Sequence, residues 1–280
     1  MITKNIINHN HKTLDTQSVT LTMTCCKRLH LFKRTIKSFH EHCLDKNLIG
    51  QIIIYDDSSP FEDRFEMEKE IATLFPNTNV FYKYFNEIPT KYRHAYIMQN
   101  WYDDVKTDFV FHLEDDRIMI KSFYLFEMID ILKRDENVGI VNIDQTKRDF
   151  PKDLIEKYNL VIDYDKNANY WVWPYIKNMR CGEILFYDTV RCEEGSREYG
   201  FPYYEQFINY AGFCLQPCVM DMRKIKTIEK FRLNNSLEAD FGVRYAEKYI
   251  TICHNESKST HLGVPWFQEK SAYEMNDSNR

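Results

Sequence analysis

The sequence predicts an α/β protein built on a doubly wound, mixed but mostly parallel sheet that is flanked by helices. Three observations support this fold class. Short apolar runs of strand length alternate with amphipathic helical stretches from Val19 to Asn142. The run Ile52–Tyr55 (IIIY) has no polar position, as expected for a strand with helices on both faces. No linker rich in Gly, Ser or Pro divides the chain, so we expect one domain with two lobes.

Apolar periodicity places the elements of the first half in order. The run Val19–Thr24 (VTLTMT) alternates and is rich in β-branched residues, which predicts a strand. The next stretch has apolar side chains at helical spacing, at Leu29, Phe32, Ile36 and Phe39, with basic residues between them. The same reasoning predicts further strands over Ile52–Tyr55, Val80–Phe85, Phe109–Leu113 and Val138–Ile143, and helices over Arg28–His42, Glu62–Phe75, Lys91–Val105 and Lys121–Arg134.

The second half is less regular. Between Asp144 and Gly212 the chain is aromatic and charged, and no periodicity predicts an element there. The segment Phe213–Met220 has strand character, but Pro217 restricts it to an edge or crossing strand. Further on we expect a helix over Ser236–Tyr249 with a Ser236 cap, a final strand over Tyr249–Cys253, and an irregular tail over His254–Trp266.

The composition describes a packed globular protein. Of the 280 residues, 44% are hydrophobic and 15% aromatic, which is enough for a large core. The net charge is −5 with both signs interspersed, so no nucleic-acid partner is expected. The eight cysteines form no CxxC pair and follow no secretory leader, and no apolar run reaches the roughly 18 residues that span a bilayer. We therefore expect a soluble, cytoplasmic protein with reduced thiols and no transmembrane segment.

Acidic residues follow two of the predicted strands. Glu114, Asp115 and Asp116 come directly after Phe109–Leu113, before a segment that reads as helix. Carboxylates gathered at the carboxyl end of a strand repel one another unless a cation or hydrogen-bond donors lie among them. A divalent metal is the simplest such cation. The alternative is a solvated acidic turn that caps the next helix.

A second acidic strand end follows Ile52–Tyr55, at Asp56 and Asp57. Together with the basic helix after the first strand and the ExD triplet, this order of motifs resembles the GT-A glycosyltransferases, especially the large inverting glycosyltransferase family 2. The resemblance implies that the second strand end contacts the nucleotide, and that the triplet holds Mn²⁺ or Mg²⁺ on the donor diphosphate. The family's usual triplet is DxD, and Glu114 replaces its first Asp with another hard oxygen donor.

A downstream segment carries a further part of the resemblance. LEADFGVR, Leu237–Arg244, is similar to the family's EDxDLGxR segment. Carried over by position, Glu238 is implied as catalytic base and Asp240 as its supporting carboxylate. The competing interpretation is a pair of acidic residues that stabilise a helix start. His261, in STHLGVPW, resembles the C-terminal His that some GT-A enzymes add as a metal ligand.

The resemblance also implies a full set of site residues. The metal ligands would be Glu114, Asp116 and His261, with His favouring Mn²⁺. His261 as an ordinary hydrogen-bonding loop residue remains the alternative. The donor-binding residues would be Thr24, Arg28, Asp56, Asp57, Arg93 and Asp115. Trp171 and Trp173 would either stack on a sugar or pack in the interior.

These features predict a metal-dependent, inverting glycosyltransferase. It would move a sugar from a nucleotide-sugar donor, with a UDP-sugar favoured, to a hydroxyl of a glycan, protein or small-molecule acceptor. The lobes would be a flexible leader over residues 1–18, a nucleotide-sugar-binding lobe over 19–143, an acceptor-binding lobe over 144–266 and a flexible tail over 267–280.

Two alternatives stay open. One is a catalytically inactive GT-A domain that binds a glycan or nucleotide. The other is a sugar nucleotidyltransferase, although these enzymes usually carry a Gly-rich phosphate loop after the first strand, and none follows Val19–Thr24 here. A phosphatase with a phospho-Asp would need Asp at alternate positions, whereas Asp56 and Asp57 are adjacent.

Overall fold

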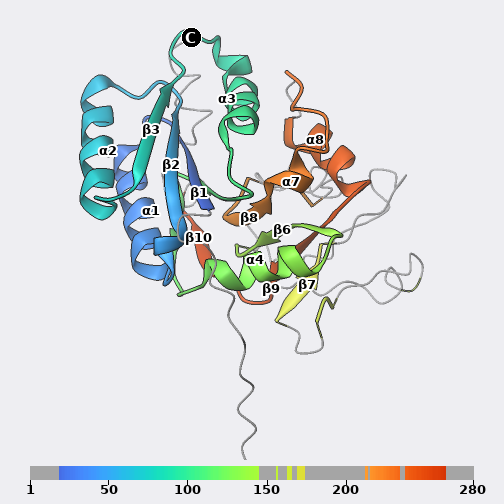
Figure 1. The fold of residues 1–280 in the computed structure, drawn as a ribbon. Coiled ribbons are helices and arrows are strands. Elements are labelled where there is room, and N and C mark those ends of the chain that lie inside the picture. The colour runs from blue at the N-terminus through green and yellow to red at the C-terminus, as the bar shows by residue number, and fades with distance from the viewer. Residues whose placement is uncertain are drawn as a thin grey trace, which may run out of the picture.

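An eight-stranded mixed sheet organises the protein (Figure 1). The computed structural model describes residues 19–144, 156, 163–165, 169–173, 212–213, 215–233 and 237–262, apart from the side chains of residues 90, 91, 237 and 239. In spatial order the strands are β3 (Asn79–Tyr84), β2 (Ile49–Asp56), β1 (Val19–Cys25), β4 (Phe109–Glu114), β8 (Cys218–Asp221), β6 (Val138–Asn142), β9 (Ile250–His254) and β7 (Tyr170–Val172).

The sheet confirms the predicted fold class. Strands β3, β2, β1 and β4 are parallel neighbours, as are β6 and β9, and crossover helices join them. Strand β8 enters antiparallel between β4 and β6. Of the two expectations for Phe213–Met220, an edge or a crossing strand, the edge strand is therefore wrong. Pro217 precedes β8, so it removes no donor from the ladder inside the strand.

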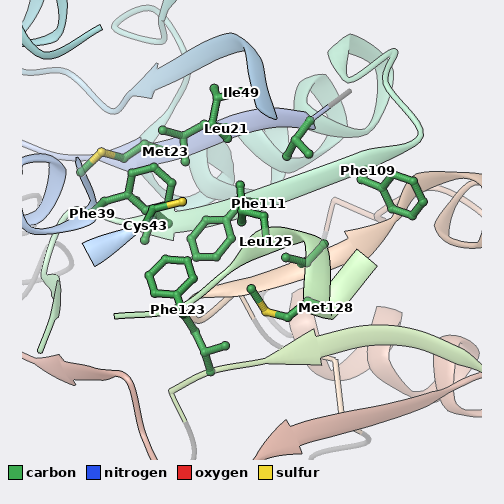
Figure 2. Close-up of a cluster of buried hydrophobic side chains, with 14 of the residues drawn as sticks. Leu21, Met23, Phe39, Cys43, Ile49, Phe109, Phe111, Phe123, Leu125 and Met128 are labelled. Carbon is green, nitrogen blue, oxygen red and sulfur yellow. The ribbon is translucent and has the colours of Figure 1, made fainter. Parts of the chain in front are cut away.

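Helices cover both faces of the sheet. On one face lie α1 (Leu29–His42), α2 (Phe61–Leu74) and α4 (Leu125–Arg134). Figure 2 shows the aromatic centre of this layer, where Phe39 of α1, Phe111 of β4 and Phe123 pack against one another. The ring centroids of Phe39 and Phe111 are 5.1 Å apart, and those of Phe111 and Phe123 are 5.6 Å apart. This packing fixes the position of β4.

The other face is covered by α3 (Thr90–Asp104), α7 (Met222–Ile225) and α8 (Leu237–Ala246). The indole of Trp101 in α3 donates to the Thr22 hydroxyl in β1 at 3.0 Å. Phe231 stacks on Phe241 of α8, with ring centroids 4.1 Å apart. Gln99 of α3 donates to the carbonyl of Phe231 at 2.8 Å. These contacts join α3 to α8 through the segment between α7 and α8.

Three local predictions are corrected around β4. The segment after Asp116 is not helical but forms β5 (Arg117–Met119), which pairs antiparallel with β10 (Ser259–His261) in the tail expected to be irregular. The next helix begins at Leu125 rather than Lys121. The backbone amides of Leu125 and Phe126 donate to the Asp45 carboxylate at 2.8 and 2.9 Å. Because this cap comes from a distant residue, the local sequence does not indicate it.

Burial decides two questions that the sequence left open. Trp171 and Trp173 are 0% and 8% exposed and pack together with Cys253, so they are core residues and not a sugar platform. The five cysteines within the described ranges are all buried and none is in a disulfide, namely Cys25, Cys26, Cys43, Cys218 and Cys253. Among the residues placed by the structure, no helix has the length and apolar character needed to cross a bilayer.

Where β6 packs against α8, position 139 has room for glycine but not for a larger residue. A Cβ added to Gly139 would lie 2.7 Å from Cε2 and 2.9 Å from the hydroxyl oxygen of Tyr245. That hydroxyl donates to the Ile250 carbonyl at 2.6 Å, so the ring has little freedom to move. We expect Gly139→Ala to lower the free energy of unfolding by about 1–3 kcal/mol through overpacking, as measured by urea denaturation.

Gly50→Ala, at a half-buried position of β2, is the matched control and should change stability far less. Equal urea midpoints for Gly139→Ala and the wild type would show that β6 and α8 are not packed as described.

Candidate functional site

The acidic strand ends meet at one edge of the sheet. In the parallel register Cys25 lies opposite Asp56, and Thr24 lies opposite Glu114. The carboxyl ends of β1, β2 and β4 therefore lie side by side, the position where open α/β sheets bind ligands. The structure thus brings the acidic ends of β2 and β4 to one edge of the sheet.

Two turns beside these strand ends have unusual backbone. Lys27, after β1, and Ser58, after β2, have φ of 52° and 65°, in the left-handed region that favours glycine. The Lys27 amide donates to the Ser59 hydroxyl at 2.9 Å, which ties the two turns together. Non-glycine residues keep such φ values only where their surroundings hold them, and functional sites are where this occurs most.

Arg28 clamps two members of the acidic triplet. Its guanidinium donates to Asp116 at 2.9 Å and also to Asp115. The other Asp115 oxygen accepts the Cys26 amide at 3.0 Å, and the Asp115 carbonyl accepts the Thr35 hydroxyl at 2.8 Å. Asp115 is thus held within the protein by both carboxylate oxygens. Asp115 therefore positions the turn. The resemblance implied that it binds the nucleotide sugar, whereas in this structure both of its carboxylate oxygens accept hydrogen bonds from the protein.

Asp116 is the member of the triplet that has an oxygen without a partner. Its Oδ2 contacts Arg28 and lies 3.2 Å from His261 Nε2, whereas its buried Oδ1 has no hydrogen-bond partner. His261 comes from β10, which is held on β5, and the Leu262 amide donates to the Asp116 carbonyl at 2.8 Å. A buried carboxylate oxygen beside an imidazole is a donor pair that fits Mn²⁺.

Glu114 does not complete a three-residue metal group. It lies with its Oε2 3.3 Å from Nε of Arg117. Within the described parts of the chain, no group of three or more His, Cys, Asp or Glu side chains is placed to hold a metal ion. The structure therefore brings Asp116 and His261 together without Glu114. A cation bound there would need further oxygen ligands from a substrate or water, which is usual for Mg²⁺ on phosphates.

The carboxylates differ in acidity. Burial raises the pKa of Glu114 to about 8, against the charge of Arg117. Burial also raises the pKa of Asp115 to about 7, although Arg28 opposes the shift. For Asp116 burial acts in the same direction, but the His261 hydrogen bond and the Arg28 charge outweigh it and lower the pKa to about 2. Asp116 is thus the carboxylate of the triplet that is ionised across the ordinary pH range.

Asp144 is a site residue that the sequence analysis missed. It follows β6, and its carboxylate accepts hydrogen bonds from Arg117 of β5 and from Ser259 of β10. The Ser257 hydroxyl donates to its carbonyl at 2.9 Å. Asp144 therefore holds the two-stranded sheet that carries His261. The signal was present, because Asp144 also follows a strand end, but we used it only as a lobe boundary.

The two acidic residues at the end of β2, Asp56 and Asp57, make different contacts. Asp56 is 1% exposed and accepts from Arg64 Nε at 2.9 Å and the Ser59 amide at 3.1 Å, so it closes the turn.

Asp57 pairs with Arg93 of α3 at 2.7 Å. Arg93 also donates to the Ile88 carbonyl at 2.9 Å. The Thr24 carbonyl accepts the Asp115 amide at 3.1 Å, which is a backbone role in β1. The Asp57–Arg93 ion pair therefore joins the turn after β2 to α3.

The two carboxylates in the first turn of α8 are also distinct. Asp240 accepts from Arg244 at 2.7 Å and from Arg232 at 3.2 Å. Glu238 lies close enough to Glu114 for its charge to add to the effect of burial in raising the Glu114 pKa. It also acts on His94 of α3, where burial lowers the pKa and the Glu238 charge opposes that shift. The charge of Glu238 thus reaches both His94 of α3 and Glu114 of the triplet.

Solved glycosyltransferases share this fold. The mannosyltransferase PcManGT from Pyrobaculum calidifontis, solved with GDP-Man and Mn²⁺, has a TM-score of 0.52 and 10% identity, over 84% of this chain and 53% of its own. S. aureus TarS 1–349 has a TM-score of 0.50 and 9% identity, over 86% and 59%. Another S. aureus TarS structure has a TM-score of 0.51 and 9% identity, over 90% and 38%.

The chain therefore has a GT-A-type glycosyltransferase fold, as the motif order predicted. It spans between about two fifths and three fifths of the length of these proteins, and at such low identity the likeness concerns the fold alone. No protein-family model and no curated protein matches the sequence. Membership of family 2 accordingly stays a prediction.

The Arg28 clamp predicts a pH-dependent stability loss. Removing the cation from two buried carboxylates leaves them uncompensated, so Arg28→Met should lower the free energy of unfolding at pH 8 by about 3–5 kcal/mol. Lowering the pH protonates these carboxylates in the folded variant, so the deficit relative to wild type should shrink towards pH 5. Urea denaturation at several pH values measures both effects.

Arg134→Met is the control, because Arg134 pairs with Asp130 at 2.8 Å on an exposed surface. It should change stability by no more than about 1 kcal/mol. A deficit in Arg28→Met that does not vary with pH would mean that the loss comes from packing and not from charge.

Proposed function

We propose that this protein is a metal-dependent, inverting glycosyltransferase that uses a nucleotide-sugar donor, with a UDP-sugar favoured. The observation that carries the proposal is the unpartnered Oδ1 of Asp116 beside His261, at the ligand-binding edge of a GT-A-type sheet. The mannosyltransferase of the same fold was solved with a nucleotide sugar and Mn²⁺.

Asp116 and His261 would hold the divalent cation, with Mn²⁺ favoured because imidazole suits it better than Mg²⁺. When bound, such a cation would neutralise the charge that grows on the departing diphosphate. The ionised state of Asp116 suits it to this task, since its pKa is lowered to about 2. Arg28 keeps Asp116 in place from the other side.

The nucleoside would lie against the turns after β1 and β2. Asp57 accepts hydrogen bonds, and the paired Arg93 offers donors, so together they suit a base with both donor and acceptor groups. Asp56, Asp115 and Thr24 support this surface from within through the contacts described above. In this proposal they shape the donor site and do not touch the donor with their side chains.

Glu238 would act as the base that removes a proton from the acceptor hydroxyl. Its position in the first turn of α8, near Glu114, puts a carboxylate beside the proposed cation site. Asp240 is held by two arginines, which suits it to orient the start of α8. Direct attack by the activated hydroxyl inverts the configuration at the anomeric carbon. The acceptor would contact the second lobe, residues 144–266.

Nucleotide binding tests the donor site. Thermal unfolding with UDP, GDP or CMP, each with and without Mn²⁺, should show stabilisation by UDP that requires Mn²⁺. At a ligand concentration of about 100 times Kd the expected gain is about 2.7 kcal/mol. Asp116→Asn should abolish the Mn²⁺-dependent part, because it removes the charge beside His261.

Asp130→Asn, an exposed substitution in α4, is the control and should respond to UDP and Mn²⁺ as the wild type does. Stabilisation by GDP instead of UDP would mean that the donor is a GDP-sugar, and the proposed site would stay the same. A response to nucleotide that is the same with and without Mn²⁺, and unaffected by Asp116→Asn, would contradict the metal assignment.

Turnover tests the base. Glu238→Gln should lower the rate of sugar transfer or donor hydrolysis at least about 100-fold, since it removes general-base catalysis. Its thermal shift with UDP and Mn²⁺ should match the wild type. Glu247→Gln, just beyond α8, is the control and should retain full activity. Full activity of Glu238→Gln would move the base to another residue, and a product with retained anomeric configuration would exclude direct displacement.

A further inference from the structure

An aromatic groove lies beside the proposed site and has no role in the function described so far. It is lined by Ile88, Pro89, Tyr92, Tyr96 and Leu233, with a volume of about 340 Å³. Tyr92 and Tyr96 are one helical turn apart on α3 and are 37% and 40% exposed. Leu233, 46% exposed, lies on the segment that leads to α8. The volume is within the range of small-molecule sites.

One wall of this groove belongs to α3 and the other to the segment that leads to α8, the helix that carries Glu238. One wall is the first half of α3, which carries His94, and His94 is close enough to sense the charge of Glu238. The other wall is the segment before α8, which is fixed on α3 by the hydrogen bond from Gln99 to Phe231. An acceptor hydroxyl at Glu238 therefore has the groove as a neighbouring surface for the rest of the molecule.

The lining favours a ligand that is apolar on one face and polar at its edge. Two tyrosine rings and three apolar side chains provide flat contact area but few hydrogen bonds. A pyranose ring has this character, since its axial C–H groups form an apolar face and its hydroxyls remain in water. We propose that this groove is an acceptor subsite in which a pyranose ring packs on Tyr92 and Tyr96. The inference rests on the proposed glycosyltransferase function.

The geometry separates this groove from the nucleoside site. Arg93 follows Tyr92 directly, yet it is 7% exposed and paired with Asp57 on the inner side of α3. Around the helix axis Tyr92 lies about 100° and Tyr96 about 60° from Arg93, and both tyrosines are more than a third exposed whereas Arg93 is buried. A base held at Asp57 and Arg93 would leave the two tyrosines for a different ligand.

Saturation-transfer NMR tests the subsite with defined probes. The methyl glycosides of glucose, galactose, mannose and N-acetylglucosamine are added at millimolar concentration, with and without UDP and Mn²⁺. At least one should receive saturation at its ring C–H protons. Tyr92→Ala and Tyr96→Ala should each weaken binding about three- to tenfold, because each removes one ring from the contact. Tyr92→Phe and Tyr96→Phe should retain binding.

Tyr124→Ala is the matched control, because Tyr124 is 39% exposed and lies before α4, on the opposite face of the sheet. It should leave glycoside binding unchanged. No saturation of any glycoside by the wild type, or equal saturation of wild type, Tyr92→Ala and Tyr96→Ala, would overturn the proposal.

The thermal shift with UDP and Mn²⁺, measured on the same variants, keeps the two proposals apart. An unchanged shift together with weakened glycoside binding supports an acceptor subsite. Loss of the nucleotide response in Tyr92→Ala with glycoside binding intact would make the groove part of the nucleoside site and overturn the inference. Absence of any nucleotide response in the wild type would remove the donor proposal, while the glycoside result would still decide the groove.

Discussion

The ion pair that joins Arg28 to Asp115 and Asp116 is the constraint on which the site depends. Three carboxylates end one strand, and like charges so close in a buried edge are unfavourable without compensation. The Arg28 guanidinium compensates the negative charge of two of them, and these two carboxylates differ in their other contacts. Asp115 is held from within by Arg28 and the Cys26 amide. Asp116 stays ionised, and its second oxygen has no partner.

The same solution recurs along the edge of the sheet. Arg64 compensates Asp56 and Arg93 compensates Asp57 at the end of β2, while Arg117 lies between Glu114 and Asp144. Arg64 of α2 and Arg117 of β5 belong to the elements that directly follow the acidic ends of β2 and β4, and Arg93 belongs to α3. Acidic and basic side chains therefore alternate along this edge of the sheet.

The sequence predicted the parts of the fold that local patterns determine. The strands β1, β2, β3, β4, β6 and β9 were found because apolar runs of strand length carry their own signal. Strands of three residues, such as β5 and β10, exist only because they pair with each other, and no local pattern reports that pairing. The start of α4 depends on Asp45, which is remote in sequence. Asp144 follows a predicted strand, which was a signal in the sequence, but its pairing with Arg117 belongs to the tertiary structure. His261 and Glu238 were reached only through the resemblance to a family.

The pairing of β10 with β5 has a consequence for how the protein is made. Arg28, Asp115 and Asp116 all belong to the first half of the chain, but His261 is near the end of the described residues and reaches Asp116 only through β10. During synthesis the acidic edge can therefore assemble long before the imidazole emerges from the ribosome. The proposed cation site is therefore completed last. In a protein that binds the metal there, almost the whole described chain has already been translated and folded.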